Sequence, residues 1–469
     1  MSPGSAPSTS EPRTLVSHPE LRSSQTLPTF KSLGEPPKNL LERTLSLFAD
    51  VRAGEGVGVV ILTVNVFLLL AGYSLLKPAR DGLILTEGGA EVKAYSAAAQ
   101  AVLLLGFVPL YGWLASRLPR MRLILASTIL IVVNLVIFNA LGASGVRIGV
   151  VFYIWLGIVN MFLVSQFWAF ANDLYTEGQG RRLFPMIGVG ASLGAWVGAA
   201  TVSPLVQRAG LSAYTLMLLG AGTILAALGL TIAANRRETQ RTDPLGKQAE
   251  QVPLGKEGGF QLILKDRYLF WIAVLTVLLN VVNSTGGFLL DKLVVAEALA
   301  RFGSDAASQA QRLAFTTGFV GSFNATVNLV GFLVQLFVTS RVMRLMGVRG
   351  ALFILPVLAL VNYSVIAVAP ILALVRIGKI LENSTDYSIQ NTIRPTLFLA
   401  TTREAKYKAK TAIDTFFTRV GDLGYAGLVY AGTALGAGLS AFAWLNVGFT
   451  ILWLFVAGQI SREHRRKTV

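Results

Sequence analysis

Cysteine is absent from this 469-residue chain, and histidine occurs only as His18 and His464. The lack of cysteine excludes disulfide frameworks, thiol catalysis, iron–sulfur clusters and cysteine-ligated zinc sites. Because both histidines lie in terminal segments, a histidine ligand or proton relay within the body of the chain is excluded too. No Gly-x-x-x-x-Gly-Lys-Ser/Thr sequence occurs, which rules out an ATP-driven pump. We therefore expect no enzyme, no metal and no cofactor.

Charged residues are also scarce. They make up 14% of the chain and hydrophobic residues 53%, whereas a soluble domain has about 25% charged residues. The mean hydropathy of +0.59 leaves too little polar surface for a water-soluble globule, so the solvent of this protein is a lipid bilayer. The net charge of +16 is then expected beside the membrane, and nucleic acid is not an expected partner.

Long apolar runs are abundant. A helix that crosses about 30 Å of hydrocarbon needs about 20 mainly apolar residues. The sequence thus predicts an all-α membrane protein with twelve transmembrane helices in two six-helix, major-facilitator-like halves. The twelve predicted spans are 56–76, 95–115, 123–142, 148–171, 183–206, 212–234, 269–290, 314–340, 350–369, 371–393, 411–436 and 439–459.

The remaining segments predict the domain organisation. Residues 1–36 are rich in Ser, Pro and Thr and are expected to be a disordered cytoplasmic tail. Residues 37–54 are expected to form a short helix along the bilayer, or equally an extension of the first span. The halves are then 55–234 and 269–460, joined by a cytoplasmic linker at 235–268, with a basic cytoplasmic tail at 461–469.

Lys and Arg concentrate in the loops on one side of the predicted spans, which predicts that both termini are cytoplasmic in a bacterial cytoplasmic (inner) membrane. Short basic turns recur at Gly112–Arg122 and Ser340–Arg349. The first resembles the loop signature of the major facilitator superfamily. The chain is expected to be a monomer.

Several glycines lie four residues apart inside predicted spans. Gly190, Gly194 and Gly198 follow Gly188 in one apolar helix with no preceding strand. This spacing favours close helix packing over a dinucleotide-binding loop. Gly432 and Gly436 predict the same kind of contact.

Ionisable residues at membrane depth are the main candidates for function, because each costs several kcal/mol unless it faces a partner or a cavity. Four fall along one face of the tenth predicted span, and three lie in the eleventh. They could form a structural ladder of ion pairs or line a hydrated pathway. The residues are Arg376, Lys379, Glu382, Asp386, Asp414, Arg419 and Asp422.

Charged residues also lie beyond the first and seventh spans. Lys77, Pro78 and Arg80 predict a helix break beside two cations, a suitable site for an anion. Asp291 and Lys292 are interpreted as extending to the membrane surface. Asparagines within spans could line a cavity or bridge helices; they are Asn65, Asn160, Asn280 and Asn283.

The chain resembles the bacterial and plastidic ATP/ADP translocase family. The resemblance rests on Tyr73–Leu83, Gly88–Glu91, Phe167–Asn172, Arg181–Phe184 and Lys406–Asp414. It implies a major-facilitator-like carrier that exchanges ATP for ADP or imports nucleotides with protons. It also implies nucleotide-binding roles for Arg80 and Lys410.

The chain departs from the family pattern at three places. Apolar Trp155 and Leu156 occupy the region of a usual acidic residue, Asp386 replaces a usual lysine, and Arg394–Pro395 replaces a Lys-Glu pair. These changes at membrane depth predict an altered substrate.

The sequence therefore predicts a secondary transporter that exchanges a small anionic solute, such as a nucleotide, by alternating access. A proton-coupled symporter of another anion and a non-transporting scaffold are the alternatives. The predicted substrate-binding residues are Lys77, Arg80, Asp81, Asn160, Arg182, Asn280, Arg376, Lys379 and Lys410. The predicted coupling or charge-network residues are Glu382, Asp386, Asp414, Arg419 and Asp422.

Overall fold

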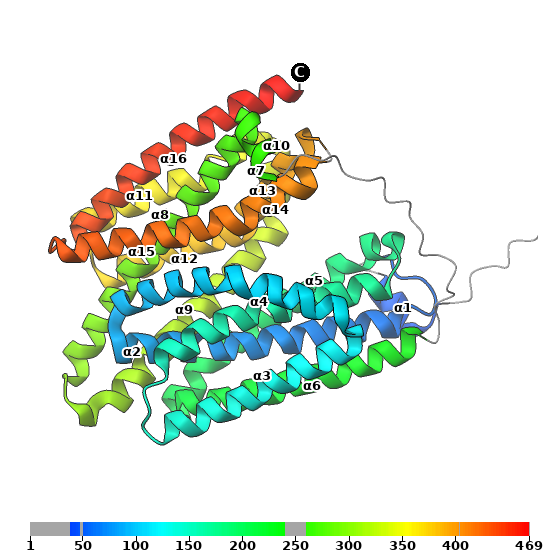
Figure 1. The fold of residues 1–469 in the computed structure, drawn as a ribbon, viewed down its shortest axis with the longest axis horizontal. Coiled ribbons are helices and arrows are strands. Elements are labelled where there is room, and N and C mark those ends of the chain that lie inside the picture. The colour runs from blue at the N-terminus through cyan, green and yellow to red at the C-terminus, as the bar shows by residue number, and fades with distance from the viewer. Residues whose placement is uncertain (1–37, 47–49, 240–258, 403, 469) are drawn as a thin grey trace, which may run out of the picture.

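The computed structural model describes residues 38–46, 50–239, 259–402 and 404–468, and all the regular structure in these residues is helical. The tail predicted at 1–36 lies outside the described residues, as do residues 240–258 of the predicted linker. Figure 1 shows the helices in two groups, with α2–α6 in one and α8 and α11–α16 in the other.

The first group begins with a short helix, and its long second helix contains two of the predicted spans. The helices are α1 (Leu40–Leu45), α2 (Gly56–Arg117), α3 (Arg120–Ala143), α4 (Gly149–Leu174), α5 (Glu177–Ser203), which continues as a π-helical turn (Pro204–Arg208), and α6 (Ala213–Thr239). Within α2 the backbone bends at Gly89, whose φ is 78°. This left-handed conformation is readily adopted only by glycine, and it separates the two predicted spans.

The second group contains more interruptions. Its α-helices are α7 (Gly259–Lys265), α8 (Arg267–Phe302), α9 (Gln309–Phe337), α10 (Thr339–Ala351), α11 (Ile354–Val368), α12 (Leu372–Thr385), α13 (Asn391–Leu397), α14 (Lys410–Ala412), α15 (Thr418–Ala434) and α16 (Leu439–Thr468). Short 3₁₀ turns occupy Ala306–Ser308 and Phe398–Ala400. Wider π-helical turns occupy Asp386–Gln390, Ala405–Ala409 and Ile413–Phe417.

Eight helices of the described residues are long and apolar enough to cross a membrane, or nine if α10 and α11, bent by 76°, form one span. The long helix α2 is counted once among these. The predicted spans at 371–393 and 411–436 are helical but divided into shorter pieces by π-helical turns. The count of twelve spans therefore stays a prediction.

Glycines bring α5 into close contact with α2, as the spacing predicts. A Cβ atom on Gly190, Gly194 or Gly198 would lie 2.2–2.5 Å from a backbone carbonyl oxygen of α2. Gly432 likewise faces the Phe442 ring. The prediction for Gly436 is wrong: no heavy atom lies within 4 Å of its Cβ position. Its φ of 68° follows the end of α15, where glycine is favoured.

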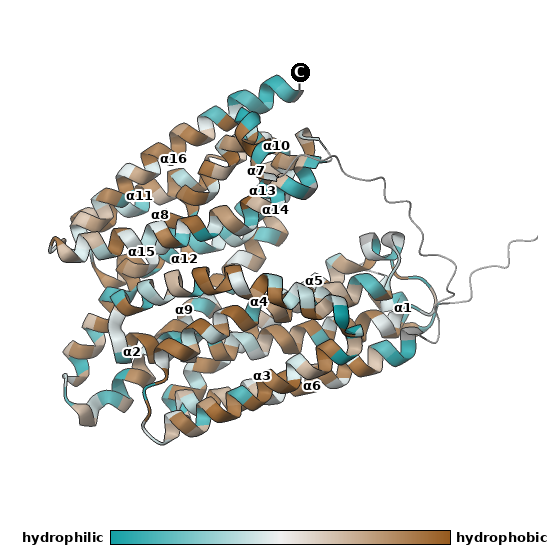
Figure 2. Cartoon of the chain, viewed as in Figure 1, coloured by the Kyte–Doolittle hydropathy of each residue, from teal (hydrophilic) through white to brown (hydrophobic). Residues whose placement is uncertain are grey.

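Large apolar side chains cover the outward faces of the helices, as a lipid-facing surface requires. Figure 2 shows this apolar character along most of the helices and a hydrophilic C-terminal end of α16. The segment 461–469 was expected to be a tail, but α16 continues to Thr468. Among the described residues of the predicted interfacial segment, α1 is the one helix, and its Glu42 accepts a hydrogen bond from the Gly54 N–H at 2.5 Å. Its position relative to lipid stays a prediction.

Candidate substrate pathway

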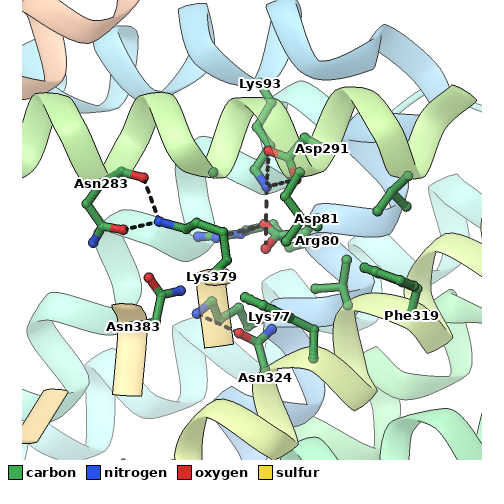
Figure 3. A pocket seen from close by; sticks show the side chains of 15 residues that line it. Lys77, Arg80, Asp81, Lys93, Asn283, Asp291, Phe319, Asn324, Lys379 and Asn383 are labelled. Atoms are coloured by element: carbon green, nitrogen blue, oxygen red, sulfur yellow. Dashed lines mark hydrogen bonds and ion pairs between the residues drawn. The ribbon is translucent and has the colours of Figure 1, made fainter. Parts of the chain in front are cut away.

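A cavity of about 210 Å³ lies between the two halves, where α2 meets α8, α9 and α12. Figure 3 shows charged and amide side chains converging on it from all four helices. Its polar lining consists of Lys77, Arg80, Asp81, Lys93, Asn283, Asp291, Asn324, Lys379 and Asn383. Two phenylalanines, three aliphatic residues and one glycine on α8 and α9 complete the wall. An apolar cavity with a few convergent polar groups is the usual form of a ligand site.

A chain of ion pairs crosses this cavity. Arg80 Nη2 lies 2.8 Å from Asp81 Oδ1, and Lys93 Nζ lies 3.8 Å from Asp81 and 2.9 Å from Asp291. Asp291 belongs to α8, so the chain joins the halves. Two cations and two carboxylates balance one another, which makes this part of the lining formally neutral.

The bend at Gly89 explains how Asp81 and Lys93 meet. Twelve residues of straight α-helix would separate them by about 18 Å along the axis. The bend turns the chain back, so that Lys93 reaches the level of Asp81. Sequence reasoning missed Lys93, which lies between two predicted spans, and interpreted Asp291 as a surface residue. The sequence offered one signal for this contact. An acidic and a basic residue follow the first predicted span, at Glu91 and Lys93, and another such pair follows the seventh, at Asp291 and Lys292.

Two further lysines, Lys77 and Lys379, line the cavity beside the balanced chain. Lys77 donates a hydrogen bond to Asn324 Oδ1 at 3.2 Å, and it has no carboxylate within 4 Å among the residues that the structure describes. Lys379 is 1% exposed and donates to Asn283 Oδ1 at 2.6 Å and to Glu382 Oε1 at 3.0 Å. Glu382 balances the charge of Lys379, so Lys77 is the cation of this lining that has no carboxylate partner among the described residues.

Glu382 is itself held firmly. It is 2% exposed and accepts a hydrogen bond from the Tyr363 hydroxyl at 2.7 Å. A buried carboxylate needs such partners to remain charged. The Lys379–Glu382 contact is thus one rung of the predicted ladder, and its lysine also reaches the cavity.

A second cavity of about 260 Å³ adjoins the first and shares Arg80, Lys93, Gly287 and Asp291 with it. The predicted network residues Arg419 and Asp422 line it and form an ion pair at 2.7 Å. Asn280, predicted to bind substrate, instead donates to Asp422 Oδ1 at 2.7 Å and lines neither cavity.

Other predicted residues lie away from these cavities. Arg182 pairs with Glu55 at 2.9 Å at the beginning of α2. Asn160 lines a small apolar pocket within the first half. Lys410 pairs with Asp414 at 2.5 Å, and Arg394 contacts the same carboxylate. These residues are about one-third exposed.

Arg376 and Asp386 do not join the ladder. Arg376 lines a separate, open cavity, where it lies 5.1 Å from the Phe319 ring centre and hydrogen-bonds Ser322. Asp386 begins a π-helical turn, and its side chain forms no hydrogen bond or ion pair with any residue the structure describes. A scaffold in which the charges of this span all pair and leave no cavity disagrees with both observations.

The halves contact each other at one end of the pathway. Lys292 pairs with Glu91 and Lys93 with Asp291, and the rings of Tyr95 and Tyr430 meet at 6.4 Å. At the other end, the ion pairs found among the described residues stay within one half, as for Arg120–Asp173 and Arg394–Asp414. This second end, where no ion pair joins the halves in the described residues, carries the basic turns that the sequence predicts to be cytoplasmic.

Residues 149–464 match the TLC ATP/ADP transporter family. The chain belongs to this family. Its curated relatives include ADP,ATP carrier protein 1 of Chlamydia pneumoniae, 24% identical over 339 residues that cover 65% of this chain and 64% of the relative. ADP,ATP carrier protein 2 of Chlamydia trachomatis serovar D is 23% identical over 86% of this chain and 87% of its own. The chain thus spans under two thirds of the first relative.

Solved transporters share the fold of this TLC-family chain. The nucleoside transporter NupG has a TM-score of 0.59 at 12% identity, over 86% of this chain and 98% of its own. A bacterial homologue of the iron transporter ferroportin, in an inward-facing state, has a TM-score of 0.61 at 13% identity, over 86% and 98%. The family match begins at Gly149, so it includes Asp291 and Lys379 but not Lys77, Arg80 or Lys93. The chain is accordingly a multi-pass membrane protein of the ATP/ADP transporter family.

Proposed function

We propose that this transporter exchanges nucleotides of the ATP/ADP type across a bacterial inner membrane by alternating access. The observation that carries the proposal is the cationic cavity between the halves, where Lys77 has no carboxylate partner and Lys379 presents its ammonium group. A phosphate chain would supply the missing negative charge. The match to a family of ATP/ADP transporters supports the same solute class.

Exchange by alternating access requires that the halves open at one end while they close at the other. The ion pairs of Glu91 and Lys93 with α8 close one end, and no such contact between halves occurs at the other end of the described structure. With the basic turns in the cytoplasm, the described state faces inward. Rocking of the halves about the cavity would then expose it to the outside.

The test is counterflow of labelled ADP into proteoliposomes preloaded with unlabelled ADP. Removing the cation of Lys77 from a desolvated phosphate contact costs about 1.5–3 kcal/mol, or about 10- to 150-fold in affinity. Lys77→Ala should therefore lose most uptake. Arg344→Ala, an exposed cation on α10, serves as the control. Wild-type carrier that shows no nucleotide counterflow would overturn the proposal.

A proton-coupled symporter of an anion is the second candidate. The position of Asp386 favours it, because a carboxylate at membrane depth that forms no ion pair with a described residue is a candidate proton carrier. Exchange requires preloaded vesicles and is indifferent to a protonophore. Strong uptake into empty vesicles that collapses with a protonophore, and that Asp386→Asn abolishes, would decide for the symporter.

The orientation is tested with single cysteines in this cysteine-free chain. Leu345 on α10 and Leu435 after α15 are 82% and 86% exposed, so a thiol at either position is accessible to an impermeant reagent. We expect Leu345→Cys to react only from the cytoplasm and Leu435→Cys only from outside. The reverse pattern would invert the proposed topology.

A further inference from the structure

The two adjoining cavities differ in chemistry. In the second cavity Tyr153 and Tyr425 are 8% and 5% exposed, and they share the lining with Gln100 and Ser284. None of these four side chains forms a hydrogen bond with another residue in the part of the chain that the structure describes. Buried polar groups in proteins are normally paired, so these uncharged groups are available to a polar solute.

The charged groups of the second cavity offer no surplus cation. Arg419 and Asp422 neutralise each other, and the shared wall of Arg80 and Lys93 is balanced by its aspartates. The first cavity, by contrast, carries Lys77, which has no carboxylate partner among the described residues, beside the paired Lys379. One side of the shared wall is suited to an anion and the other to a neutral group with several hydrogen-bonding atoms.

The geometry of the second cavity preserves this neutral lining. Gly157 leaves room for Gln100, whose Oε1 lies 2.0 Å from the position that a Cβ on Gly157 would occupy. The Tyr153 ring lies against Arg80, with the guanidinium carbon 4.4 Å from the ring centre. Arg80 thus contacts the face of the ring, and the phenol hydroxyl forms no hydrogen bond with a described residue.

We propose that the second cavity is the subsite for the uncharged base and ribose of the nucleotide, while the first cavity holds its phosphates. This inference rests on the proposed function and deepens it. Neither cavity reaches the roughly 300 Å³ at which drug-sized ligands are usually enclosed, and a nucleotide would bridge both across the Arg80–Lys93 wall. Tyr153, Tyr425 and Gln100 are then the residues that distinguish a nucleotide from a bare polyphosphate.

The experiment compares ADP with inorganic pyrophosphate as ligands of the purified full-length protein, by titration calorimetry. Tyr153→Phe and Tyr425→Phe each remove one hydroxyl and keep the ring. Losing one neutral hydrogen bond should weaken ADP binding by about 2- to 12-fold. Pyrophosphate affinity should stay within about twofold, which also reports that each variant is folded.

Two controls complete the design. Tyr430→Phe, five residues from Tyr425 on the same helix and 67% exposed, should leave both affinities unchanged. Lys77→Ala should weaken both ligands. Equal losses for ADP and pyrophosphate in the tyrosine variants, or no loss for either, would overturn the nucleoside subsite. Wild-type protein that binds pyrophosphate but not ADP would overturn the proposed function itself.

Discussion

The two halves of the protein hold their helices together by different means. In the first half α5 lies against α2 through Gly190, Gly194 and Gly198, which places backbone against backbone. In the second half the corresponding depth of α12 is occupied by the buried pair of Lys379 and Glu382. The first arrangement depends on the absence of side chains, and the second on the exact pairing of charged ones.

Helix continuity follows the same division. Among the described residues the first half has one π-helical turn, at the end of α5, whereas the second has three, next to α12, α14 and α15. Wide turns of this kind often occur at functional sites, because they reorient side chains within a helix. The comparison indicates a first half that serves as a rigid wall and a second half whose charged groups can be rearranged by a solute.

The largest effect on stability is expected from a substitution in the second half. Glu382→Leu leaves the Lys379 ammonium buried without its carboxylate, which costs about 3–5 kcal/mol in the free energy of unfolding. Replacing both partners, in Lys379→Met/Glu382→Leu, should recover most of this stability because no charge is stranded. Chemical denaturation in detergent measures both. A loss below about 1 kcal/mol in the single variant would show that the pair is not effectively buried.

The next effect is expected in the first half. Gly194→Val puts a side chain where a Cβ alone would lie 2.2 Å from the Phe67 carbonyl oxygen. Overpacking of this kind costs about 1–3 kcal/mol. Gly188→Val is the matched control on the same helix, since nothing lies within 4 Å of that Cβ position. Equal unfolding free energies for the two variants would contradict a rigid backbone contact between α5 and α2 at Gly194.

A smaller effect is expected where the halves meet. Lys292→Ala removes the partly exposed pair with Glu91, which is worth about 0.2–1 kcal/mol. The outward-facing population should rise about 1.4- to 5-fold. The measurement is the rate at which an external impermeant reagent labels a cysteine at Asn324.

The control for that measurement is Arg301→Ala. Arg301 pairs with Glu297 on the same helix. Its substitution therefore removes an ion pair that does not connect the two halves. If both variants change the labelling rate equally, the Glu91–Lys292 contact is not a gate.

The smallest effect concerns Glu55, at the beginning of α2. Burial raises the pKa of its carboxyl. Hydrogen bonds from Arg182, the Arg52 N–H and Gln179 lower that pKa by more than burial raises it, so the pKa lies below its ordinary value. A lowered pKa gives stability that is present above the unfolded value, about pH 4.3, and is lost as the pH falls through the folded value. The pair contributes about 0.5 kcal/mol.

Thermal unfolding at about pH 6 and about pH 3.5 tests this contribution. Wild type should exceed Glu55→Gln in melting temperature at the higher pH, and the difference should shrink at the lower one. A difference that grows on acidification would reverse the sign of the argument.

Only part of the pathway could be predicted from the sequence. Lys77, Arg80, Asp81 and Lys379 were recognisable because ionisable residues among apolar ones need a partner or a cavity, and all four line the first cavity. Arg182 is ionisable too, but it meets Glu55, which lies 127 positions away in the chain. Neither periodicity nor charge distinguishes a cavity-lining arginine from one that pairs at the end of a helix.

Hydropathy and helix length are local properties, so the sequence was enough to predict an all-helical membrane protein and the approximate positions of most of its helices. The family motifs are equally local. Only the tertiary structure decided which charges are shared between the halves and which cation is left without a carboxylate. The bend at Gly89 brings Lys93 to Asp81, and the approach of α8 adds Asp291. Electrostatic pairing depends on distances of a few ångströms between remote segments, and only the packing of the two halves sets those distances.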